Sequence, residues 1–490
     1  MSSVLLSRLL AGIAPVSHDV LLHDLTQHSH EVRPGAAFLA CRGARRHGLE
    51  FAADVAQRGA VAILWEPDGR TLPPVLESDI VLAEVPQLSQ RASELADRFF
   101  EFPSRELAVV GVTGTNGKTT CAWLLAQALN AVGRPAAYLG TLGSSFGSEH
   151  VAGELTTPDA VSVQRLLADF HARGARQVAM EVSSHGLAQG RVRAVRFDAA
   201  VFTNLTRDHL DYHGDMASYG AVKASLFERD AVRLRVFNVD DVFGSELAAR
   251  PMFAGRIACS RRAAPPAPYL YARDIEFAAA GTSFMLESSF GGARIATALL
   301  GEFNVDNVLA VLAVLLGSGI ELPAAAAALA VLSAPTGRLE KINGATGPTA
   351  VVDFAHTPDA LDKVLQVLRR HCAGRLTVVF GCGGERDRGK RAQMGEIAAR
   401  RADRIVLTDD NPRHEDGDRI IADIKAGIGA HAVAVIRDRR AAIEQALAGA
   451  TADDVVLVAG KGHENYQIVG DEKRAFSDQQ VLRKMLGPVR

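Results

Sequence analysis

Short apolar runs alternate with helical patterns through the middle of the chain. Runs rich in valine and other strand-forming residues occur at 107–112, 178–182, 199–203 and 233–238. Each run is as long as one buried strand, and the segments between them carry the apolar spacing of helices. Strands that alternate with helices build a mainly parallel sheet with helices on both faces. The pattern therefore predicts a central sheet of this kind.

The last third of the chain alternates even more regularly. Its apolar runs predict strands at 350–354, 376–380, 404–408 and 455–459, and its helical patterns lie near 359–370, 391–401 and 439–448. A polar cluster follows each of the four strands. Since ligands gather at the carboxyl ends of parallel strands, this part of the chain is expected to hold a binding site there.

The beginning of the chain has fewer and shorter patterns. Residues 36–40 and 61–64 predict strands, 51–58 predicts a helix, and 2–13 predicts an amphipathic helix because Arg8 interrupts its apolar residues.

Proline, glycine and polar residues punctuate the chain near positions 106 and 335. The predicted fold class is α/β with three domains. Residues 1–106 form an α/β N-terminal domain, 107–335 a central P-loop-type domain with a mainly parallel sheet, and 336–490 a Rossmann-like C-terminal domain.

Composition narrows the class of protein. The 490 residues are too many for one core, and 48% hydrophobic with 22% charged residues is ordinary for a soluble protein. A formal net charge of −2 favours neither nucleic acid nor an anionic membrane. The five cysteines are scattered without a Cys-x-x-Cys pair, which fits a reducing compartment. The apolar stretch 308–320 is too short to span a bilayer. We expect a cytoplasmic protein, with no nucleic-acid partner and no membrane insertion.

A glycine-rich loop between a predicted strand and helix carries the first chemical signal. It consists of Gly114, Thr115, Asn116, Gly117, Lys118, Thr119 and Thr120. Such a loop lets backbone N–H groups approach phosphates, while Lys118 neutralises the β and γ phosphates and the Thr119 hydroxyl binds Mg²⁺. Val112 stands where the strict motif has its first glycine. The alternative is a glycine turn without a ligand.

Two polar segments follow later strands of the same part. Glu181 begins Glu-Val-Ser-Ser-His, and His209 lies in Asp-His-Leu-Asp-Tyr-His. Phosphoryl transfer to a carboxylate brings anions together, so divalent ions are needed, and Glu181 and His209 offer ligands. The pattern does not fit a metalloprotease, because leucine occupies position 210, where the metalloprotease motif has glutamate. The alternative to a metal site is that these histidines have a hydrogen-bonded structural role.

The loop spelled Thr-Gly-Thr-Asn-Gly-Lys-Thr resembles the ATP loop of the Mur ligases and of their relatives, the folylpolyglutamate synthetases. The resemblance extends over most of the chain and implies an ATP-dependent acid–amino-acid ligase that forms an amide through an acyl phosphate. In the family, the residues matching Glu181 and His209 bind metal, and a lysine matching Lys223 is carbamylated and helps to hold it. From the residues alone, Lys223 would be an exposed helical lysine.

Further motifs resemble parts of the family's nucleotide site. Asn304 and Asn307 lie in Gly-Glu-Phe-Asn-Val-Asp-Asn, which in the family reaches the adenine. Arg338 lies in Gly-Arg-Leu-Glu, whose arginine contacts phosphates when the domains close. Asp353 begins Asp-Phe-Ala-His, which resembles a motif near ribose and phosphate. Taken singly, each motif also fits a structural role as a helix cap or a surface cation.

The C-terminal clusters indicate the amino acid. Arg386 and Arg413 are cations suited to a carboxylate, and Glu464 with the backbone of Gly460 can receive an ammonium. This set fits the far end of a diamino-dicarboxylic acid, whereas lysine lacks the distal carboxylate. Arg413 ends a tetrapeptide with Asp410, Asn411 and Pro412, and Pro412 is expected in the first turn of a helix. Asp-Asn-Pro-Arg is the family's signature for meso-diaminopimelate; a plain strand-to-helix turn is the alternative.

The resemblance also implies a nucleotide-sugar substrate. Ser29, in His28-Ser29-His30, matches the serine of the family's Asp-Ser-Arg, while both flanking residues differ. The positions matching those that hold the muramoyl dipeptide are Thr156, Thr157, Ser183, Gln189 and Arg191. The implied reaction joins meso-diaminopimelate to the D-glutamyl γ-carboxylate of UDP-N-acetylmuramoyl-L-alanyl-D-glutamate in peptidoglycan precursor synthesis.

The expected ligands are therefore small molecules: ATP, the UDP-muramoyl dipeptide, meso-diaminopimelate and Mg²⁺, bound by a monomer. Two alternatives remain open on the sequence. A folylpolyglutamate-synthetase-like ligase shares the phosphate loop, but it does not require the Asp-Asn-Pro-Arg cluster. An ATP-regulated binding protein would not need Lys118, Glu181, His209 and Lys223 together.

Overall fold

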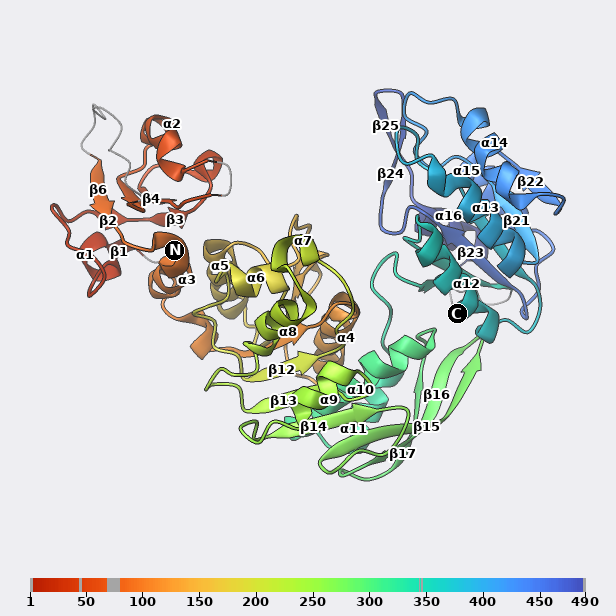
Figure 1. Ribbon diagram of the computed structural model, residues 1–490, viewed down its shortest axis with the longest axis horizontal. Helices are drawn as coiled ribbons and strands as arrows, with labels where there is room; N and C mark the ends of the chain where they lie inside the picture. Colours follow the sequence, from red (N-terminus) through yellow and green to blue (C-terminus); the bar gives the residue numbers. More distant parts are fainter. Residues whose placement is uncertain (1–2, 44–45, 68–79, 343, 345–346, 488–490) are drawn as a thin grey trace. The chain divides into compact units, whose positions relative to one another are not determined.

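The computed structural model describes residues 3–43, 46–67, 80–342, 344 and 347–487. The chain divides into two compact units (Figure 1). The first comprises Met1–Ser260, Pro265–Tyr269 and Ala313–Gly319, and the second comprises Arg261–Ala264, Leu270–Leu312 and Ile320–Arg490.

The first unit starts with a small parallel sheet of order β3-β4-β5-β6. Its apolar side chains alternate between two buried clusters, because successive strand residues face opposite sides. One cluster packs under α3, and the other packs under α2. The elements are β1 (Val4–Leu5), α1 (Leu6–Leu9), β2 (Leu21–Leu22), β3 (Asp24–Thr26), η1 (Ser29–Glu31), β4 (Ala36–Ala40), η2 (Gly48–Phe51), α2 (Ala52–Gln57), β5 (Ala62–Trp65), β6 (Val81–Glu84) and α3 (Leu88–Phe99).

The expected helix over 2–13 is wrong for most of its length. The helix there has only four residues, and Val4–Leu5 pairs instead with Leu21–Leu22 as a strand; Ser2 lies outside the described residues. The apolar spacing that suggested a helix is satisfied because Leu6, Leu9 and Leu10 are buried in the cluster under α3.

The second part of the first unit is a larger sheet of order β10-β9-β8-β11-β7-β12-β13-β14. Strands β8, β11, β7, β12, β13 and β14 are parallel, and β9 and β10 are antiparallel. The elements are η3 (Pro103–Arg105), β7 (Ala108–Thr113), α4 (Lys118–Ala131), β8 (Ala136–Gly140), β9 (Gly143–Phe146), β10 (Glu149–Val151), α5 (Ala160–Ala172), β11 (Gln177–Glu181), α6 (Ser184–Ala188), β12 (Ala199–Phe202), α7 (Leu210–His213), α8 (Met216–Ala224), β13 (Leu234–Asn238), α9 (Val242–Ala248) and β14 (Arg256–Ser260).

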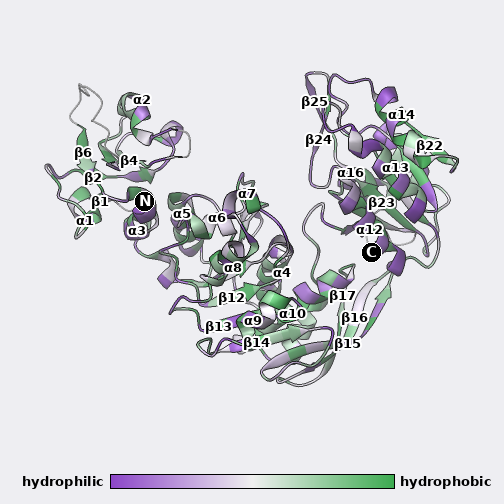
Figure 2. Cartoon of the chain, in the orientation of Figure 1, coloured by the Kyte–Doolittle hydropathy of each residue, from purple (hydrophilic) through white to green (hydrophobic). Residues whose placement is uncertain are grey.

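The second unit begins with an antiparallel sheet that the sequence patterns did not predict. Strands β15 and β17 flank β16, and α11 packs against β17. The elements are β15 (Tyr269–Ala278), β16 (Gly281–Ser288), β17 (Ala293–Thr297), α10 (Glu302–Gly317) and α11 (Leu322–Ala330). Helix α10 buries residues 308–316 of the apolar stretch and ends at Gly317, and Figure 2 gives the hydropathy of each element. Among the described residues, no helix is long and apolar enough to cross a membrane.

A six-stranded sheet of order β18-β19-β23-β20-β21-β22 completes the second unit. Only β18 is antiparallel to its neighbour. One face packs under α12, α13 and α14, and the other packs under α15 and α16. The elements are β18 (Glu340–Ile342), β19 (Thr349–Asp353), α12 (Pro358–His371), β20 (Leu376–Phe380), α13 (Gly389–Arg401), β21 (Arg404–Leu407), α14 (Gly417–Ile428), β22 (Val433–Val435), α15 (Arg439–Leu447), β23 (Val455–Ala459), β24 (Tyr466–Val469), β25 (Glu472–Ala475) and α16 (Asp478–Leu486).

The prediction of an α/β chain with parallel sheets is confirmed. The expected strands at 36–40, 376–380 and 455–459 coincide with β4, β20 and β23, and most others differ by one residue. Such runs were identifiable because strands covered on both faces are continuously apolar. The hairpin strands were missed since their exposed faces carry polar residues that break up the apolar pattern.

Candidate functional site

The phosphate loop is a four-residue connection, Gly114–Gly117, between β7 and the first residue of α4. Gly114 has a φ of +147°, and a Cβ there would lie 1.9 Å from the Thr203 hydroxyl oxygen. The Thr203 hydroxyl donates to the Asn116 carbonyl (2.6 Å), which fixes the far side of the loop. The predicted strand, loop and helix are confirmed, and only glycine fits at position 114.

Lys118 folds back over this loop. Its Nζ donates to the carbonyls of Gly114 (3.0 Å) and Thr115 (2.8 Å). Burial lowers the pKa of the Lys118 ammonium, against the opposing attraction of Glu181 and Asp208. Two weak carbonyl acceptors are poor compensation for a buried cation, so the loop is suited to an anion such as a phosphate.

Glu181, the last residue of β11, is completely buried. Its Oε2 accepts a hydrogen bond from the Thr119 hydroxyl (2.8 Å), while its Oε1 accepts bonds from the Tyr138 hydroxyl (2.6 Å) and the Thr141 N–H (2.8 Å). The structure thus joins two of the predicted metal ligands, Thr119 and Glu181. Both supply oxygen, the donor that Mg²⁺ prefers.

Lys223 is not the exposed helical lysine that composition would suggest. It lies on α8, is 1% exposed, and donates from Nζ to the Gly114 carbonyl (2.8 Å). Burial and then the nearby charge of Lys118 lower the pKa of its ammonium to about 7. A large fraction of this amine is therefore neutral near neutral pH, which is the form that can react with CO₂.

His209 lies at the start of α7 in the left-handed region, with a φ of +52°. Its ring centroid is 4.8 Å from that of His185, and a cavity of about 260 Å³ is lined by His209, Lys118 and Lys223. Among the described residues, no group of three His, Cys, Asp or Glu side chains could hold a metal ion by itself. The predicted ligand set contains only two residues of those types, so its assignment stays a prediction.

Four of the five predicted dipeptide-binding residues, Thr156, Thr157, Ser183 and Arg191, line the same cavity, whereas Gln189 does not. The cavity is also lined by Leu155, Ser184, His185 and Tyr219, which were not predicted. Thr157 is buried and donates to the Glu181 carbonyl (2.9 Å). Arg191 donates to the Thr157 carbonyl (2.6 Å) and through Nε and Nη2 to Gln189 Oε1. Ser183 caps α6 by accepting from the Gly186 N–H (3.0 Å). Arg191 is thereby held with its fork at the cavity wall.

A second cavity of the first unit, of about 780 Å³, lies between the η1 segment and the start of α5. His28 and His30 line it, whereas Ser29 is not among its lining residues. The His28 ring lies 3.3 Å from Asp159, and a hydrogen bond to that carboxylate raises the pKa of His28. Arg165 also lines the cavity and pairs with Asp24 (2.7 Å).

The nucleotide motifs of the second unit are held mainly by their own backbone. Asn304 donates to the Leu300 carbonyl (2.7 Å) and accepts from Asn307 (2.9 Å), both buried in the first turn of α10. Asp353 accepts from the N–H groups of Leu339 (2.8 Å) and Ala355 (2.8 Å). Asp353 therefore fixes the segment that carries Arg338. Contact between these residues and a nucleotide stays a prediction.

The polar clusters at the four strand ends of the C-terminal sheet converge, as predicted. A cavity of about 420 Å³ is lined by Phe354, His356, Thr357, Gly381, Cys382, Gly383, Arg386, Asp387, Lys390, Asp410, Asn411, Arg413, Gly460 and Glu464. The expectation that Pro412 lies in the first turn of a helix is wrong, because α14 begins at Gly417. Residues 410–413 instead form a loop whose backbone pairs with β24, through Arg413 N–H to the Ile468 carbonyl (3.1 Å).

The cavity wall contains opposed charges. Glu464 Oε2 accepts from Lys461 Nζ (3.0 Å) and Asn411 Nδ2 (3.0 Å). Asp410 is buried beside Gly460, where a Cβ would lie 2.5 Å from Asp410 Oδ2. Burial raises the pKa of the Asp410 carboxyl, against the charges of Arg439 and Lys461. A carboxylate-rich corner of this kind suits an ammonium group.

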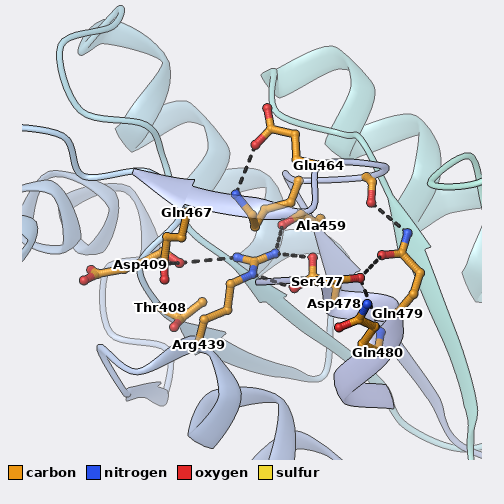
Figure 3. A network of polar contacts seen from close by, with 12 residues as sticks. Thr408, Asp409, Arg439, Ala459, Glu464, Gln467, Ser477, Asp478, Gln479 and Gln480 are labelled. Atoms are coloured by element: carbon orange, nitrogen blue, oxygen red, sulfur yellow. Dashed lines mark hydrogen bonds and ion pairs between the residues drawn. The ribbon is translucent and has the colours of Figure 1, made fainter. Parts of the chain in front are cut away.

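Arg439 supports this corner without lining the cavity (Figure 3). It is buried on α15 and donates to both Asp478 oxygens (2.8 Å each) and to the Ala459 carbonyl (3.1 Å). Ala459 directly precedes the cavity residue Gly460, so a buried ion pair anchors that strand end.

Several cavity residues were not predicted as site residues. Lys390 and Thr357 lie at the cavity that contains Arg386 and Arg413, and His185 and Tyr219 lie at the cavity of Lys223. The signal for His185 and Lys390 was present, since each stands in a polar cluster after a strand. Nothing in the sequence indicated Tyr219, which contributes by packing under the Lys223 ammonium at 4.5 Å.

Three family models match the chain. They are described as Mur ligase family, catalytic domain (residues 21–100), Mur ligase middle domain (112–315) and Mur ligase, glutamate ligase domain (337–462). The chain belongs to the Mur ligase family.

Similar individual proteins share one name. Two curated UDP-N-acetylmuramoyl-L-alanyl-D-glutamate–2,6-diaminopimelate ligases are similar over nearly the whole chain. The protein of Xanthomonas campestris pv. campestris is 49% identical, over 99% of this chain and 97% of its own. That of Pseudomonas syringae pv. tomato is 47% identical, over 95% of both chains. A solved structure of a ligase with this name has a TM-score of 0.75 at 34% identity and covers 95% of this chain and 94% of its own.

Proposed function

We propose that the chain is an ATP-dependent ligase that joins 2,6-diaminopimelate to the D-glutamyl γ-carboxylate of UDP-N-acetylmuramoyl-L-alanyl-D-glutamate. The observation that carries the proposal is the cavity at the C-terminal strand ends, where Arg386 and Arg413 stand with Asp410 and Glu464. Two cations and two carboxylates match the groups of a diamino-dicarboxylic acid. The names of the similar ligases support this substrate.

ATP would lie at the Gly114–Thr120 loop. When ATP binds, Lys118 would exchange its hydrogen bonds to the loop carbonyls for bonds to phosphate oxygens. The N-terminus of α4 would add the positive end of its helix dipole. Thr119 and Glu181 would hold Mg²⁺, with His209 and carbamylated Lys223 as further ligands; the ion would neutralise charge between phosphate and carboxylate. The free Lys223 ammonium does not fit a cation site, whereas its carbamate would.

Two steps make the amide. The γ-phosphorus of ATP is attacked by a γ-carboxylate oxygen of the D-glutamyl residue, the bond to the β-phosphate oxygen breaks, and ADP leaves. The neutral amine of diaminopimelate then attacks the acyl carbon; the carbon–oxygen bond to phosphate breaks, inorganic phosphate leaves, and the nitrogen loses one proton to the departing phosphate or to water. The protein supplies positioning: Arg191 at the carboxylate substrate, and Lys118 at the phosphates.

The amino acid would be selected by its far end. Arg413 and Arg386 would receive the distal carboxylate, and Glu464 with Asp410 the distal ammonium. Lysine has no distal carboxylate, so the two arginines would have no anion to pair with. An unpaired cation in a partly closed site would weaken the binding of lysine. The His28–Asp159 cavity would hold the uridine diphosphate end of the other substrate, where His28 and His30 offer protons to phosphate oxygens.

Phosphate release tests the proposal. We expect release from ATP only when both UDP-N-acetylmuramoyl-L-alanyl-D-glutamate and meso-diaminopimelate are present, with a tripeptide product of the matching mass. Release with folate and glutamate in their place would favour the folylpolyglutamate alternative, and ATP binding without release would favour a binding protein. Electron density at Lys223 in crystals would decide carbamylation.

A further inference from the structure

Two of the loops that line the C-terminal cavity of about 420 Å³, the proposed amino-acid cavity, touch each other. One loop contains Gly383, Gly384 and Glu385, and the other contains residues 410–415. The Gly384 N–H donates to the Asn411 carbonyl (3.0 Å), and Arg413 Nη1 donates to the Gly384 carbonyl (2.8 Å). A Cβ at Gly384 would lie 1.9 Å from the Pro412 carbonyl oxygen. The distance between the loops is therefore fixed by direct contact.

Both loops hold a residue in a backbone conformation that ordinary side chains disfavour. Glu385 has a φ of +53° and Arg413 a φ of +52°. Such residues are strained and persist only where surrounding contacts hold them. Arg413 is held by backbone bonds to Ile468 and from Gly470. The contact that holds Glu385 comes from a different side chain.

Glu415 supplies that contact. Its Oε2 accepts the N–H of Glu385 (3.1 Å), and its two oxygens receive parallel hydrogen bonds from Arg391 Nη1 and Nη2 (2.8 Å each). The Arg391 side chain is 0% exposed, and Nη2 also reaches the Gly383 carbonyl (3.5 Å). The hydrogen bonds of Arg391 and of the Glu385 N–H lower the pKa of Glu415 to about 2. This carboxylate is thus ionised throughout the working pH range.

Neither Arg391 nor Glu415 lines the cavity. Arg386, which does, is exposed and has no hydrogen bond or ion pair with the residues that the structure describes. Its backbone directly follows Glu385, so the placement of its guanidinium depends on how firmly Glu385 is held. We propose that the Arg391–Glu415 pair is a positioning device that sets the spacing of Arg386 and Arg413, and thereby decides recognition of the distal carboxylate.

The inference rests on the proposed function, and Asp423 offers a matched control. Asp423 on α14 also accepts from Arg391 (2.9 Å), but among the described residues it has no hydrogen bond or ion pair with either loop. Glu415→Gln keeps the size of the side chain and removes the parallel ionic pair. Asp423→Asn makes the same chemical change to the other partner of Arg391.

The experiment measures steady-state kinetics of the full chain with ATP, the UDP-muramoyl dipeptide, and either meso-diaminopimelate or L-lysine. For Glu415→Gln we expect the KM for diaminopimelate to rise about tenfold or more, with kcat and the KM for ATP within about threefold. The preference for diaminopimelate over lysine should fall by a similar factor. Asp423→Asn should leave all of these values within about twofold.

Folding is separated from positioning by thermal melting and by a second variant. Arg391→Lys keeps a cation for the Glu415 and Asp423 carboxylates but loses the parallel bonds, and we expect it to repeat the Glu415→Gln change in KM. Equal KM changes in Glu415→Gln and Asp423→Asn, or no change in either Glu415→Gln or Arg391→Lys, would overturn the inference. A parent chain that is inactive with diaminopimelate would instead overturn the proposed function.

Discussion

Lys118 and Lys223 converge on one acceptor, the Gly114 carbonyl, from different elements. Two buried cations at one carbonyl repel each other, and this repulsion contributes to the low pKa of Lys223. An anion between them would remove the repulsion. The loop is therefore electrostatically prepared for phosphate before any ligand binds.

Replacing Lys118 by methionine should abolish most turnover while leaving the fold intact. Among the described residues its Nζ donates to the loop carbonyls of Gly114 and Thr115, so the substitution removes a charge at the phosphates; we expect phosphate release to fall about 100-fold or more. Lys363→Met removes an exposed lysine paired with Asp359 on α12 and should keep the parent rate. A Lys118→Met protein with parental phosphate release would contradict the assigned role.

The His28–Asp159 contact should make stability depend on pH. The pKa of His28 is raised above 6.5, so the folded state binds this proton more tightly, and the resulting stability is complete below 6.5 and is lost as pH rises through the raised pKa. His28→Gln should therefore lower Tm at about pH 5.5 by about 1–3 °C, and the difference should shrink above about pH 8.

His150→Gln, at an exposed position on β10, is the control for this measurement and should give no pH-dependent difference in Tm. A His28→Gln difference that is constant over the whole pH range would argue against the ion pair.

At the scale of elements, the turn between β7 and α4 depends on one glycine. Gly114→Ala would place a Cβ 1.9 Å from Thr203 Oγ1 at a φ of +147°, so the loop must move. We expect phosphate release to fall at least about 100-fold.

Gly133→Ala is the control for this prediction. It also introduces a side chain at positive φ (+75°), but nothing lies within 4 Å of its Cβ. It should lose about 1 kcal/mol of stability and keep its turnover. Similar losses of turnover in both variants would show that backbone conformation alone, rather than the contact with Thr203, matters.

Helices α15 and α16 are joined through the Arg439–Asp478 pair, in which both side chains are fully buried. Asp478→Ala leaves an unpaired buried guanidinium, so we expect a loss of about 3–5 kcal/mol in the free energy of unfolding, measured by urea denaturation. Asp418→Ala removes an exposed partner of Arg437 and should change it by less than about 1 kcal/mol. A small effect of Asp478→Ala would mean that Arg439 reaches solvent or another acceptor.

At the scale of the whole molecule, the chemistry is divided between the two units. The phosphate loop with Glu181 and Lys223 belongs to the first unit, and the amino-acid cavity belongs to the second. The proposed reaction would join groups held by the two units, so we expect every substrate to be needed for turnover.

Metal removal should stop the reaction as a whole. ATP and the substrate carboxylate are both anionic, and in the first unit Thr119 and Glu181 offer oxygen ligands for a divalent ion, with His209 as a further candidate ligand. Excess chelator should abolish phosphate release, and Mg²⁺ in excess over chelator should restore it. Full turnover in chelator would mean that the protein's own cations suffice.

The sequence by itself determined the central strands of the parallel sheets and, to within about a residue, their ends. Runs such as 376–380 and 455–459 are apolar at every position because both faces of their sheet are covered, and polar clusters follow them because strand ends meet solvent and ligand. The glycines and lysine of the phosphate loop were equally identifiable, since their chemistry depends on neighbours in the chain.

Tertiary structure decided what depends on contacts between distant residues. Burial of Lys223 against Gly114, over 109 positions, turns an ordinary lysine into one with a low pKa. The bond from Arg391 to Glu415, 24 positions apart, places the loops of the amino-acid cavity. Neither contact can be predicted from the sequence, because packing between distant residues decides burial and charge pairing. The spacing of neighbouring residues indicates only which face of a helix or strand a residue occupies.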